Sequence, residues 1–349
     1  MRFSGPSNKP LLFALASQHT RCYRIKPPPD NIPLHALMMM APEYYVFTGE
    51  RVPDHITHVL IHKALNFVPT RAFYEHPNIQ EVICHDGVEK IEGWTFSVCP
   101  SLRRVIMPGV KVVAQCAFYF CKALTYIECG KLEDIGDDAF SNCESLNSVD
   151  LPSIKIVGGG AFQGCRSLVN AKFGKELGSI KGNAFAYCRS LERIALPLKD
   201  GIISVDNTFT LCVKLNRVDL VEAELHETIG ALLMEGWKSD MNEEIDAISR
   251  ILPSTHAGDY RNDPLFYHAG EKAREIRTWM RSVLRKYTQY KAEHRRYLSM
   301  ATATLQSSLP NDVVLKNVLP FLELPSYACE ADDDDSEDDN IPLAALRLA

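Results

Sequence analysis

The chain has 349 residues, of which 46% are hydrophobic and 23% are charged, and its formal net charge is −6. This length allows two or three domains, and the composition is ordinary for a globular protein. Much of the negative charge lies in one run near the end, so the chain as a whole is not an electrostatic nucleic-acid binder. No apolar stretch reaches the roughly 18–20 residues that span a bilayer, so no membrane span is expected.

Residues 1–40 are predicted to form a disordered basic segment, because they carry scattered Arg and Lys and the helix-breaking run Pro27–Pro29. The short apolar run Leu11–Ala16 resembles a signal-peptide core but lies at the lower limit of the usual length. The chain also has no N-glycosylation acceptor, so a cytoplasmic or nuclear location is expected and secretion is the alternative. Residues 41–67 are predicted to be an N-terminal cap, with Val59 and Ile61 in its strand.

Residues 68–222 contain seven units with a period of 22–24 residues, each anchored on a phenylalanine that follows Ala or Thr. The anchors are Phe73, Phe96, Phe118, Phe140, Phe162, Phe185 and Phe209. Three residues after the last six anchors stand Cys99, Cys121, Cys143, Cys165, Cys188 and Cys212, whereas the first unit has His76. Further columns of Leu or Ile and of Val or Ile follow at fixed offsets, as in Leu146 and Val149.

This spacing predicts a solenoid. The V-x-L pairs alternate with period two, which favours short strands that stack in parallel about 4.8 Å apart. One unit cannot bury its own apolar side, so its stability depends on its neighbours. The phenylalanine and cysteine columns are therefore the predicted structural core, and the cysteines are expected to be buried and reduced. The triplet Gly158–Gly160 precedes an anchor, which favours a turn over a phosphate-binding loop.

The pattern A-F-x-x-C-x-x-L-x-x-I-x-L-P resembles the BspA-like leucine-rich repeats, and Ile135–Pro152 matches it almost position by position. The lead-in Glu50–Val59 and the stretch Met241–Pro253 look like BspA-like proteins of microbial eukaryotes, including diatoms. The resemblance implies an interaction scaffold without a catalytic centre, and the bacterial founders of the family are surface adhesins.

Residues 223–322 are predicted to form a helical hairpin and a short C-terminal helix, because apolar residues recur at three and four between Leu225 and Leu252 and again after Glu271. The fold class is thus α+β, a leucine-rich-repeat solenoid of short parallel strands followed by an α-helical hairpin. The second helix is basic over 271–296, but a solvated face is favoured over nucleic-acid binding. Residues 309–322 resemble the opening of an F-box, and residues 323–349 are predicted to be a disordered acidic tail.

The sequence predicts a binding protein and not an enzyme. No motif supplies a nucleophile together with a base, and no cofactor is implied. His55, His58 and His62 lack an acidic or cysteine partner at metal-ligand spacing, so a metal site is disfavoured. The expected partner is a protein that binds the outward side chains of the strands, while an F-box-like substrate receptor and an exported adhesin are the alternatives. The candidate binding residues are Arg104, Tyr126, Glu128, Asp150, Lys172, Arg193 and Arg217.

Overall fold

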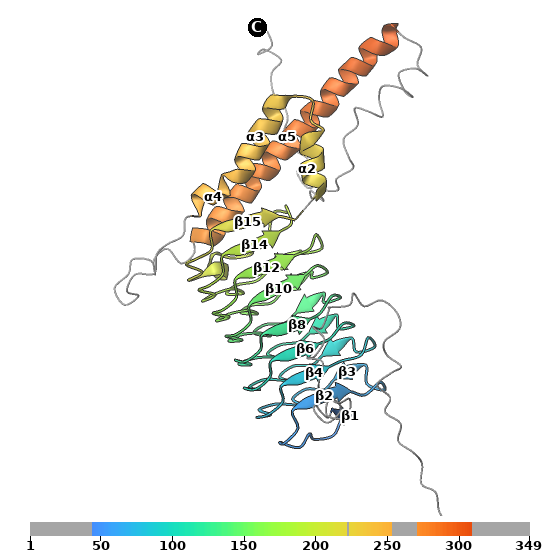
Figure 1. The fold of residues 1–349 in the computed structure, drawn as a ribbon. Coiled ribbons are helices and arrows are strands. Elements are labelled where there is room, and N and C mark those ends of the chain that lie inside the picture. Colours follow the sequence, from blue (N-terminus) through green and yellow to red (C-terminus); the bar gives the residue numbers. More distant parts are fainter. Residues whose placement is uncertain (1–43, 222, 253–270, 309–349) are drawn as a thin grey trace, which may run out of the picture. The chain divides into compact units, whose positions relative to one another are not determined.

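The computed structural model describes residues 44–221, 223–252 and 271–308. Its repeats form a parallel-strand solenoid of about seven turns, and a helical region follows the last turn (Figure 1). The chain is therefore an α+β protein, as the repeat pattern predicts. The predicted segments 1–40, 309–322 and 323–349 lie outside the described residues.

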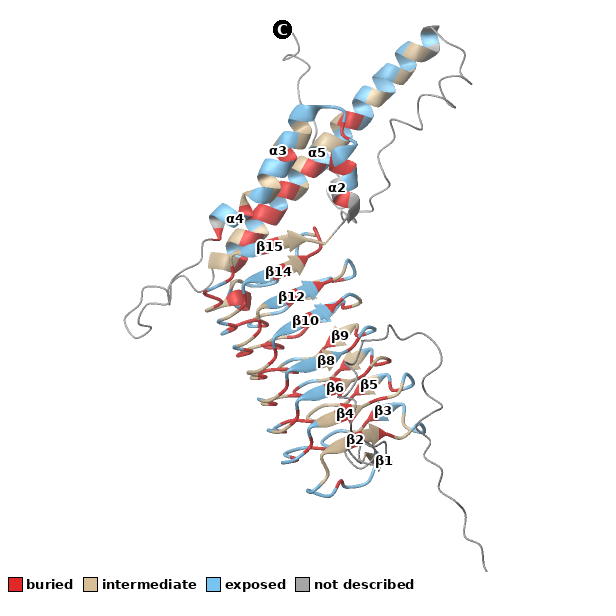
Figure 2. Cartoon of the chain, in the orientation of Figure 1, coloured by how far each residue is buried: buried red, intermediate tan, exposed pale blue. Residues whose placement is uncertain are grey.

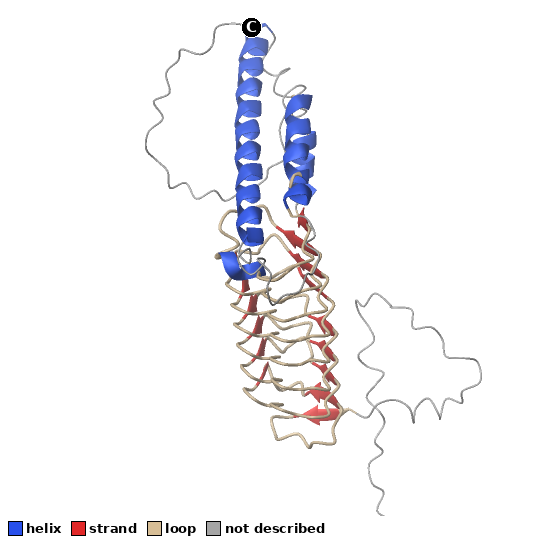
Figure 3. Cartoon of the chain, turned by 90° about the vertical axis from the view of Figure 1, so that its left-hand side faces the viewer, coloured by secondary structure: helices blue, strands red, loops and turns tan. Residues whose placement is uncertain are grey.

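Two rows of strands run along two sides of the solenoid (Figure 3). The first row consists of β1 (Tyr45–Phe47), β2 (His58–Ile61), β4 (Glu81–Ile83), β6 (Arg104–Ile106), β8 (Tyr126–Glu128), β10 (Ser148–Leu151), β12 (Asn170–Phe173), β14 (Arg193–Leu196) and β15 (Arg217–Leu220). The second row consists of β3 (Phe67–Val68), β5 (Lys90–Ile91), β7 (Val112–Val113), β9 (Asp134–Ile135), β11 (Ile156–Val157) and β13 (Ser179–Ile180). The second row was not predicted, although its buried residues form a Val and Ile column five residues before each of the first six anchors.

The first row is not one continuous sheet. It consists of a five-stranded sheet that ends at β8 and a four-stranded sheet that begins at β10. The second row is continuous through the same coils, because β9 pairs with both β7 and β11. The discontinuity therefore affects only one side of the solenoid, where Ile127 is only partly buried while the matching Val105 and Val149 are buried.

The phenylalanine anchors form a single interior stack. Neighbouring rings from Phe73 to Phe209 lie 4.8 to 5.6 Å apart between centroids and within 18° of parallel. All seven anchors are at most 1% exposed, and the interior side of each coil is buried (Figure 2). Phe47 of the N-terminal cap packs against the end of the stack, 4.7 Å from Phe73 and tilted by 50°, so the cap closes the end of the core.

The cysteine column has a hydrogen-bonding role that the sequence reasoning missed. Each thiol donates to the carbonyl of the phenylalanine in the preceding coil, as Cys143 Sγ does to Phe118 O at 3.2 Å. The other five make the same contact at 2.9 to 3.2 Å. In the first unit, His76 Nε2 donates instead to Pro53 O of the cap at 3.1 Å. A small buried donor is needed here because an unpaired buried carbonyl destabilises the fold.

The turn around each anchor, which we call the turn edge, has an unusual backbone. The residues two before and two after the anchor have positive φ in nearly every coil, as Asp138 (55°) and Asn142 (59°) do around Phe140. This conformation turns their N–H groups toward the next coil, and Asn142 N donates to Gln163 O at 2.6 Å. The glycine triplet lies in this turn: Gly160 has φ +62°, and a Cβ on Gly158 would come within 2.5 Å of the preceding coil.

The helices are η2 (Asp206–Phe209), α2 (Ala223–Gly230), α3 (Glu235–Asp246), α4 (Ile248–Ile251) and α5 (Glu271–Ser308). The prediction of one helix from Leu225 to Leu252 was wrong. The chain interrupts it between α2 and α3, where Met234 is extended (φ −101°, ψ 125°). In that interruption, Leu233 N donates to His294 Nδ1 of α5 at 3.2 Å, which supplies one partner for the broken backbone.

The helix α5 runs antiparallel to α3 and contacts the last coil. Trp279 Nε1 donates to Glu244 O at 2.8 Å, and Lys286 pairs with Asp240 at 3.0 Å. Residue numbers thus increase along α5 in the direction in which they decrease along α3. Lys272 Nζ donates to Leu215 O at 2.5 Å, in the coil that follows Cys212. The helix thus satisfies a carbonyl at the open end of the solenoid, which is the role of a cap.

Candidate protein-binding surface

The candidate residues lie on the outward side of the first row, which we call the strand face. Parallel strand pairing places Arg104 beside Tyr126 in the five-stranded sheet. It places Arg193 beside Arg217 in the four-stranded sheet. Two positions further along, Asp150, Lys172 and Asp219 belong to the outward-facing set of the second sheet. Because side chains alternate along a strand, the residues between them face the core, which leaves this set available to solvent.

In the five-stranded sheet, the candidate residues form a short chain of contacts. Arg104 pairs with Glu81 at 3.3 Å, and its guanidinium lies 5.4 Å from the centroid of the Tyr126 ring. The Tyr126 hydroxyl lies 3.4 Å from Glu128, and the Tyr126 side chain stays 45% exposed. Burial and a hydrogen bond to Glu81 raise the pKa of the Tyr44 hydroxyl to about 12, so this phenol stays a neutral donor. These contacts hold an aromatic ring and a cation in place on the surface.

In the four-stranded sheet, one carboxylate holds two guanidiniums. Arg193 and Arg217 both pair with Asp219, the latter at 2.9 Å. The two arginine side chains are 50% and 60% exposed, whereas that of Asp219 is 22% exposed. Lys172 pairs with Asp150 at 3.6 Å. Since Asp219 fixes the Nε side of both guanidiniums, their outer N–H groups remain presented to solvent.

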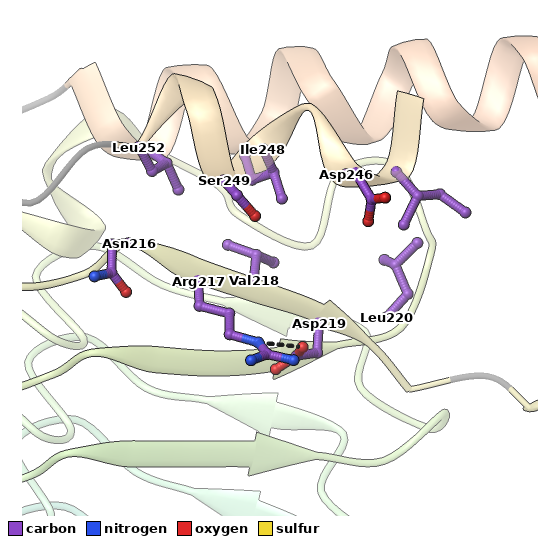
Figure 4. Close-up of a pocket in the computed structure, with 10 residues that line it drawn as sticks. Asn216, Arg217, Val218, Asp219, Leu220, Asp246, Ile248, Ser249 and Leu252 are labelled. Carbon is purple, nitrogen blue, oxygen red and sulfur yellow. Dashed lines mark hydrogen bonds and ion pairs between the residues drawn. The ribbon is translucent and has the colours of Figure 1, made fainter. Parts of the chain in front are cut away.

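Two hollows adjoin this arginine pair. One of about 560 Å³ lies between β15 and α4, with Arg217, Asp219 and Leu220 on one wall and Ile248 and Ser249 on the other (Figure 4). The second, of about 480 Å³, lies over β12 and β14 and shares Asp219 and Leu220 with the first. Together they form a groove from the middle of the strand face to the C-terminal helices. Sequence reasoning missed this groove, because its second wall comes from α3 and α4.

The discontinuity between β8 and β10 divides the candidate residues. Arg104, Tyr126 and Glu128 belong to one sheet, whereas Asp150, Lys172, Arg193 and Arg217 belong to the other. Arg104 contacts Glu81 and Tyr126 within the first sheet, and Lys172 contacts Asp150 within the second. The strand face therefore offers two adjoining surfaces and not one uniform ladder.

The cysteines that follow the anchors are buried and poorly ionised. Burial raises the pKa of the Cys165 and Cys212 thiols to about 12 and that of Cys143 well above its ordinary value. A thiol with so high a pKa has almost no thiolate at neutral pH and is a poor nucleophile. The nine cysteines in the described ranges are all free and buried, which fits a structural column.

Four of the nine cations between Lys272 and Arg296 contact carboxylates of the chain itself. Arg274 and Arg277 pair with Asp206 of η2, and Arg281 pairs with Asp200 at 2.9 Å. Lys286 pairs with both Asp240 and Glu244, and these two carboxylates raise its pKa well above the ordinary value. These pairs hold α5 against the last coil and against α3.

His58 and His62 of the N-terminal cap contact neighbouring groups of the chain. His58 lies beside Thr57 Oγ1 and against the Tyr44 ring, and His62 Nδ1 accepts from Ala64 N. Within the described ranges, no three His, Cys, Asp or Glu side chains gather as metal ligands would. None of the helices described there is both long and apolar enough for a bilayer.

A second surface feature lies outside the predicted set. Four aromatic residues, Tyr74, Trp94, Tyr119 and Phe120, follow one another along the turn edge of the first three coils, and we call them the aromatic row. The sequence contains a signal for it, because aromatic residues recur within two positions of the first three anchors, but that signal is not periodic over the whole repeat.

The family model for the BspA type leucine-rich repeat region matches in two overlapping parts, residues 52–156 and 133–238. These parts span more than half of the chain. The chain belongs to the BspA-type leucine-rich-repeat family. Leucine-rich-repeat proteins generally mediate protein–protein interactions, and the homologues of this chain are typically non-enzymatic scaffolds.

Solved leucine-rich-repeat proteins share segments with the chain. A leucine-rich repeat protein from Bacteroides ovatus is 31% identical over 41% of this chain and 38% of its own, with a TM-score of 0.39. The leucine-rich repeat protein of T. pallidum is 29% identical over 40% of this chain and 68% of its own, with a TM-score of 0.37. The chain thus spans well under half of the first structure. Among curated proteins, no match was found.

Proposed function

We propose that this BspA-type protein is a non-catalytic scaffold that binds a protein partner through its strand face. The observation that carries the proposal is the groove beside Arg193 and Arg217, in which exposed cations and apolar walls lie together. Arginine and tyrosine are enriched among residues that dominate binding energy, and both stand on this face. The outward residues can differ from coil to coil, because they do not contribute to the uniform interior columns.

We further propose that the chain is of the microbial-eukaryote type and works inside the cell. The lead-in Glu50–Val59 and the helical region after the repeats support the first point. The nine free thiols of the described ranges support the second, because an oxidising compartment favours disulfides.

The test compares two triple variants of the full chain in affinity purification with quantitative mass spectrometry. The strand-face variant is Tyr126→Ser, Lys172→Ser and Arg217→Ser. The control is Lys90→Ser, Lys155→Ser and Ile156→Ser, which changes exposed side chains on or beside the second row. Both variants should keep the melting temperature within about 2–4 °C of the parent, since exposed substitutions change stability little.

We expect the strand-face variant to lose bound proteins by about tenfold or more while the control keeps them, which corresponds to the loss of a binding hot spot. Equal retention by both variants would show that the partner binds elsewhere. Equal loss would show that neither row is a specific surface.

A further inference from the structure

The helix α5 carries all its arginines on one side, and we call this set the arginine stripe. Successive residues of a helix are rotated by about 100° around its axis, so these arginines fall within a sector of about 100°. The buried residues of the helix, such as Ile276, Val283 and Tyr287, lie on the opposite side. The stripe consists of Arg274, Arg277, Arg281, Arg285, Arg295 and Arg296.

The first half of the stripe binds carboxylates of the chain itself. Arg274 and Arg277 pair with Asp206, and Arg281 pairs with Asp200 at 2.9 Å. Both carboxylates lie in the irregular last coil, between β14 and the end of η2. The outer side of α5 is therefore a surface on which arginines already hold carboxylates in place.

The second half of the stripe has no such partner among the described residues. Arg285, Arg295 and Arg296 are exposed, and none of them forms an ion pair there. The nearest acidic residue of the helix, Glu293, accepts a hydrogen bond from Gln289 at 2.9 Å. The carboxylates of α3 that contact α5 pair with a lysine on its inner side. This half thus presents three cations over about 17 Å of helix, with one carboxylate close by.

The complementary charge lies further along the same chain, in the acidic run 330–339, which is outside the described residues. Eight of its ten residues are Asp or Glu. The run follows Ser308, which ends α5 beyond α2 and α3 (Figure 1). Along the helix, Ser308 is about 18 Å from Arg296 and about 35 Å from Arg285. The connecting residues 309–329 can extend to about 70 Å, so the run can reach the whole second half.

The tether favours this segment over a separate polyanion. A ligand that is joined to its site through a connection of this length has an effective concentration on the order of millimolar. Its eight carboxylates also outnumber the three arginines, so the contact does not need one fixed register. An external polyanion must displace the run before it can contact the arginines.

We propose that the acidic run 330–339 lies along the second half of the arginine stripe and blocks it against other polyanions. Its carboxylates take the place there that Asp200 and Asp206 take on the first half. The inner side of α5 then caps the solenoid, while its outer side binds an acidic segment of the same chain. This surface is separate from the strand face, so the inference does not depend on the proposed scaffold function.

The first test measures access to the run in the full chain, by limited proteolysis with endoproteinase Glu-C and mass spectrometry of cleavage after Glu330. The stripe variant is Arg285→Gln, Arg295→Gln and Arg296→Gln. The matched control changes three exposed arginines of the cap and the repeats that form no ion pair among the described residues: Arg51→Gln, Arg103→Gln and Arg166→Gln. Both variants should keep the melting temperature within about 2–4 °C of the parent.

We expect cleavage after Glu330 to be about threefold or more faster in the stripe variant than in the parent, because cleavage follows the population in which the run is accessible. The control should be cleaved at the rate of the parent. At about 0.5 M salt the difference should disappear, since salt screens contacts between exposed charges. The rates should be the same at about 0.5 and about 20 μM protein, because the contact lies within one chain.

The second test measures binding of a fluorescein-labelled single-stranded DNA of about twenty nucleotides by fluorescence anisotropy. The neutral-run variant keeps the full chain and carries Asp332→Asn, Asp333→Asn, Asp334→Asn and Asp335→Asn. We expect it to bind the DNA about tenfold more tightly than the parent, because the arginines become accessible to phosphates. Adding the three stripe substitutions should remove this gain, whereas adding the three control substitutions should preserve it.

Several outcomes would overturn the proposal. Equal cleavage rates in the parent and the stripe variant would show that the stripe does not cover the run. Faster cleavage in the control variant would show that any loss of positive charge has the same effect. Protection that increases with protein concentration would assign the run to a second copy of the chain. DNA binding that stays weak in the neutral-run variant, or that persists after the stripe substitutions, would show that the run does not block the stripe.

Discussion

The phenylalanine stack is testable at Phe140, which lies between Phe118 at 5.0 Å and Phe162 at 5.4 Å and is fully buried. Replacing it with alanine removes one ring from the interior and leaves a cavity that the flanking coils, held by backbone hydrogen bonds, cannot close. Substitutions of this kind cost about 3–5 kcal/mol, a large fraction of the roughly 5–15 kcal/mol that stabilises a typical domain. The corresponding fall in melting temperature is about 6–20 °C.

The assay is urea unfolding of Phe140→Ala followed by circular dichroism, with thermal melts in parallel. Ile156→Ala is the matched control, because this residue is 41% exposed on the second row close to the same coil and should change stability by less than about 0.5 kcal/mol. Phe209→Ala should cost about 0.5–1.5 kcal/mol less than Phe140→Ala, since its ring stacks on Phe185 alone. A loss below about 1 kcal/mol for Phe140→Ala, or an equal loss for Ile156→Ala, would refute the stack as the source of stability.

Two further predictions concern buried titratable groups. Burial lowers the pKa of His76 below 6.5, so the folded chain binds this proton less readily than the unfolded chain does. The neutral ring therefore contributes stability above about pH 6.5, and that stability is lost as the pH falls below this value. The unfolding free energy of the parent should therefore fall more between about pH 7.5 and 5.5 than that of His76→Gln, and an equal fall in both would contradict the assignment. The raised pKa of the Cys165 and Cys212 thiols predicts that neither reacts with Ellman's reagent in the native chain at about pH 8, although both react in urea. Peptide mapping by mass spectrometry identifies the labelled cysteines. Labelling of Cys165 in the native chain would contradict the prediction.

The interior packing could be predicted from the sequence, because every coil of the solenoid repeats the same interior positions. Phe118, Phe140 and Phe162 meet only because equal spacing brings equal positions together in successive coils. The reason for the cysteines could not be predicted, since the carbonyl that Cys143 contacts belongs to the preceding coil. His76 shows the same rule at the end of the column, where the acceptor becomes Pro53 of the cap. Composition alone suggested a small apolar residue and not a donor.

The surfaces were harder to predict, because each depends on contacts that have no period. Arg193 and Arg217 were predicted as separate outward residues, yet Asp219 joins them and the second wall of the groove comes from residues after the last repeat. The basic residues of α5 were judged by their charge, whereas their partners, such as Asp206, lie in the irregular last coil. Where the repeat breaks off, the spacing of residues in the sequence therefore no longer predicts which side chains contact one another.

The left-handed turn positions show how much backbone strain the interior stack can offset. Nearly every coil has positive φ at the turn edge, where the N–H groups reach the next coil, and the conformation is the same whether Asn142 or Phe120 stands there. Each bulky residue in this conformation costs about 1–2 kcal/mol relative to glycine, which a stack of seven anchors can offset. A solenoid can therefore retain unfavourable residues at chosen coils without losing its fold. Tyr187 and Leu211 of the last coils have positive φ as Trp94 and Phe120 of the first coils do, so the cost is accepted at both ends of the repeats.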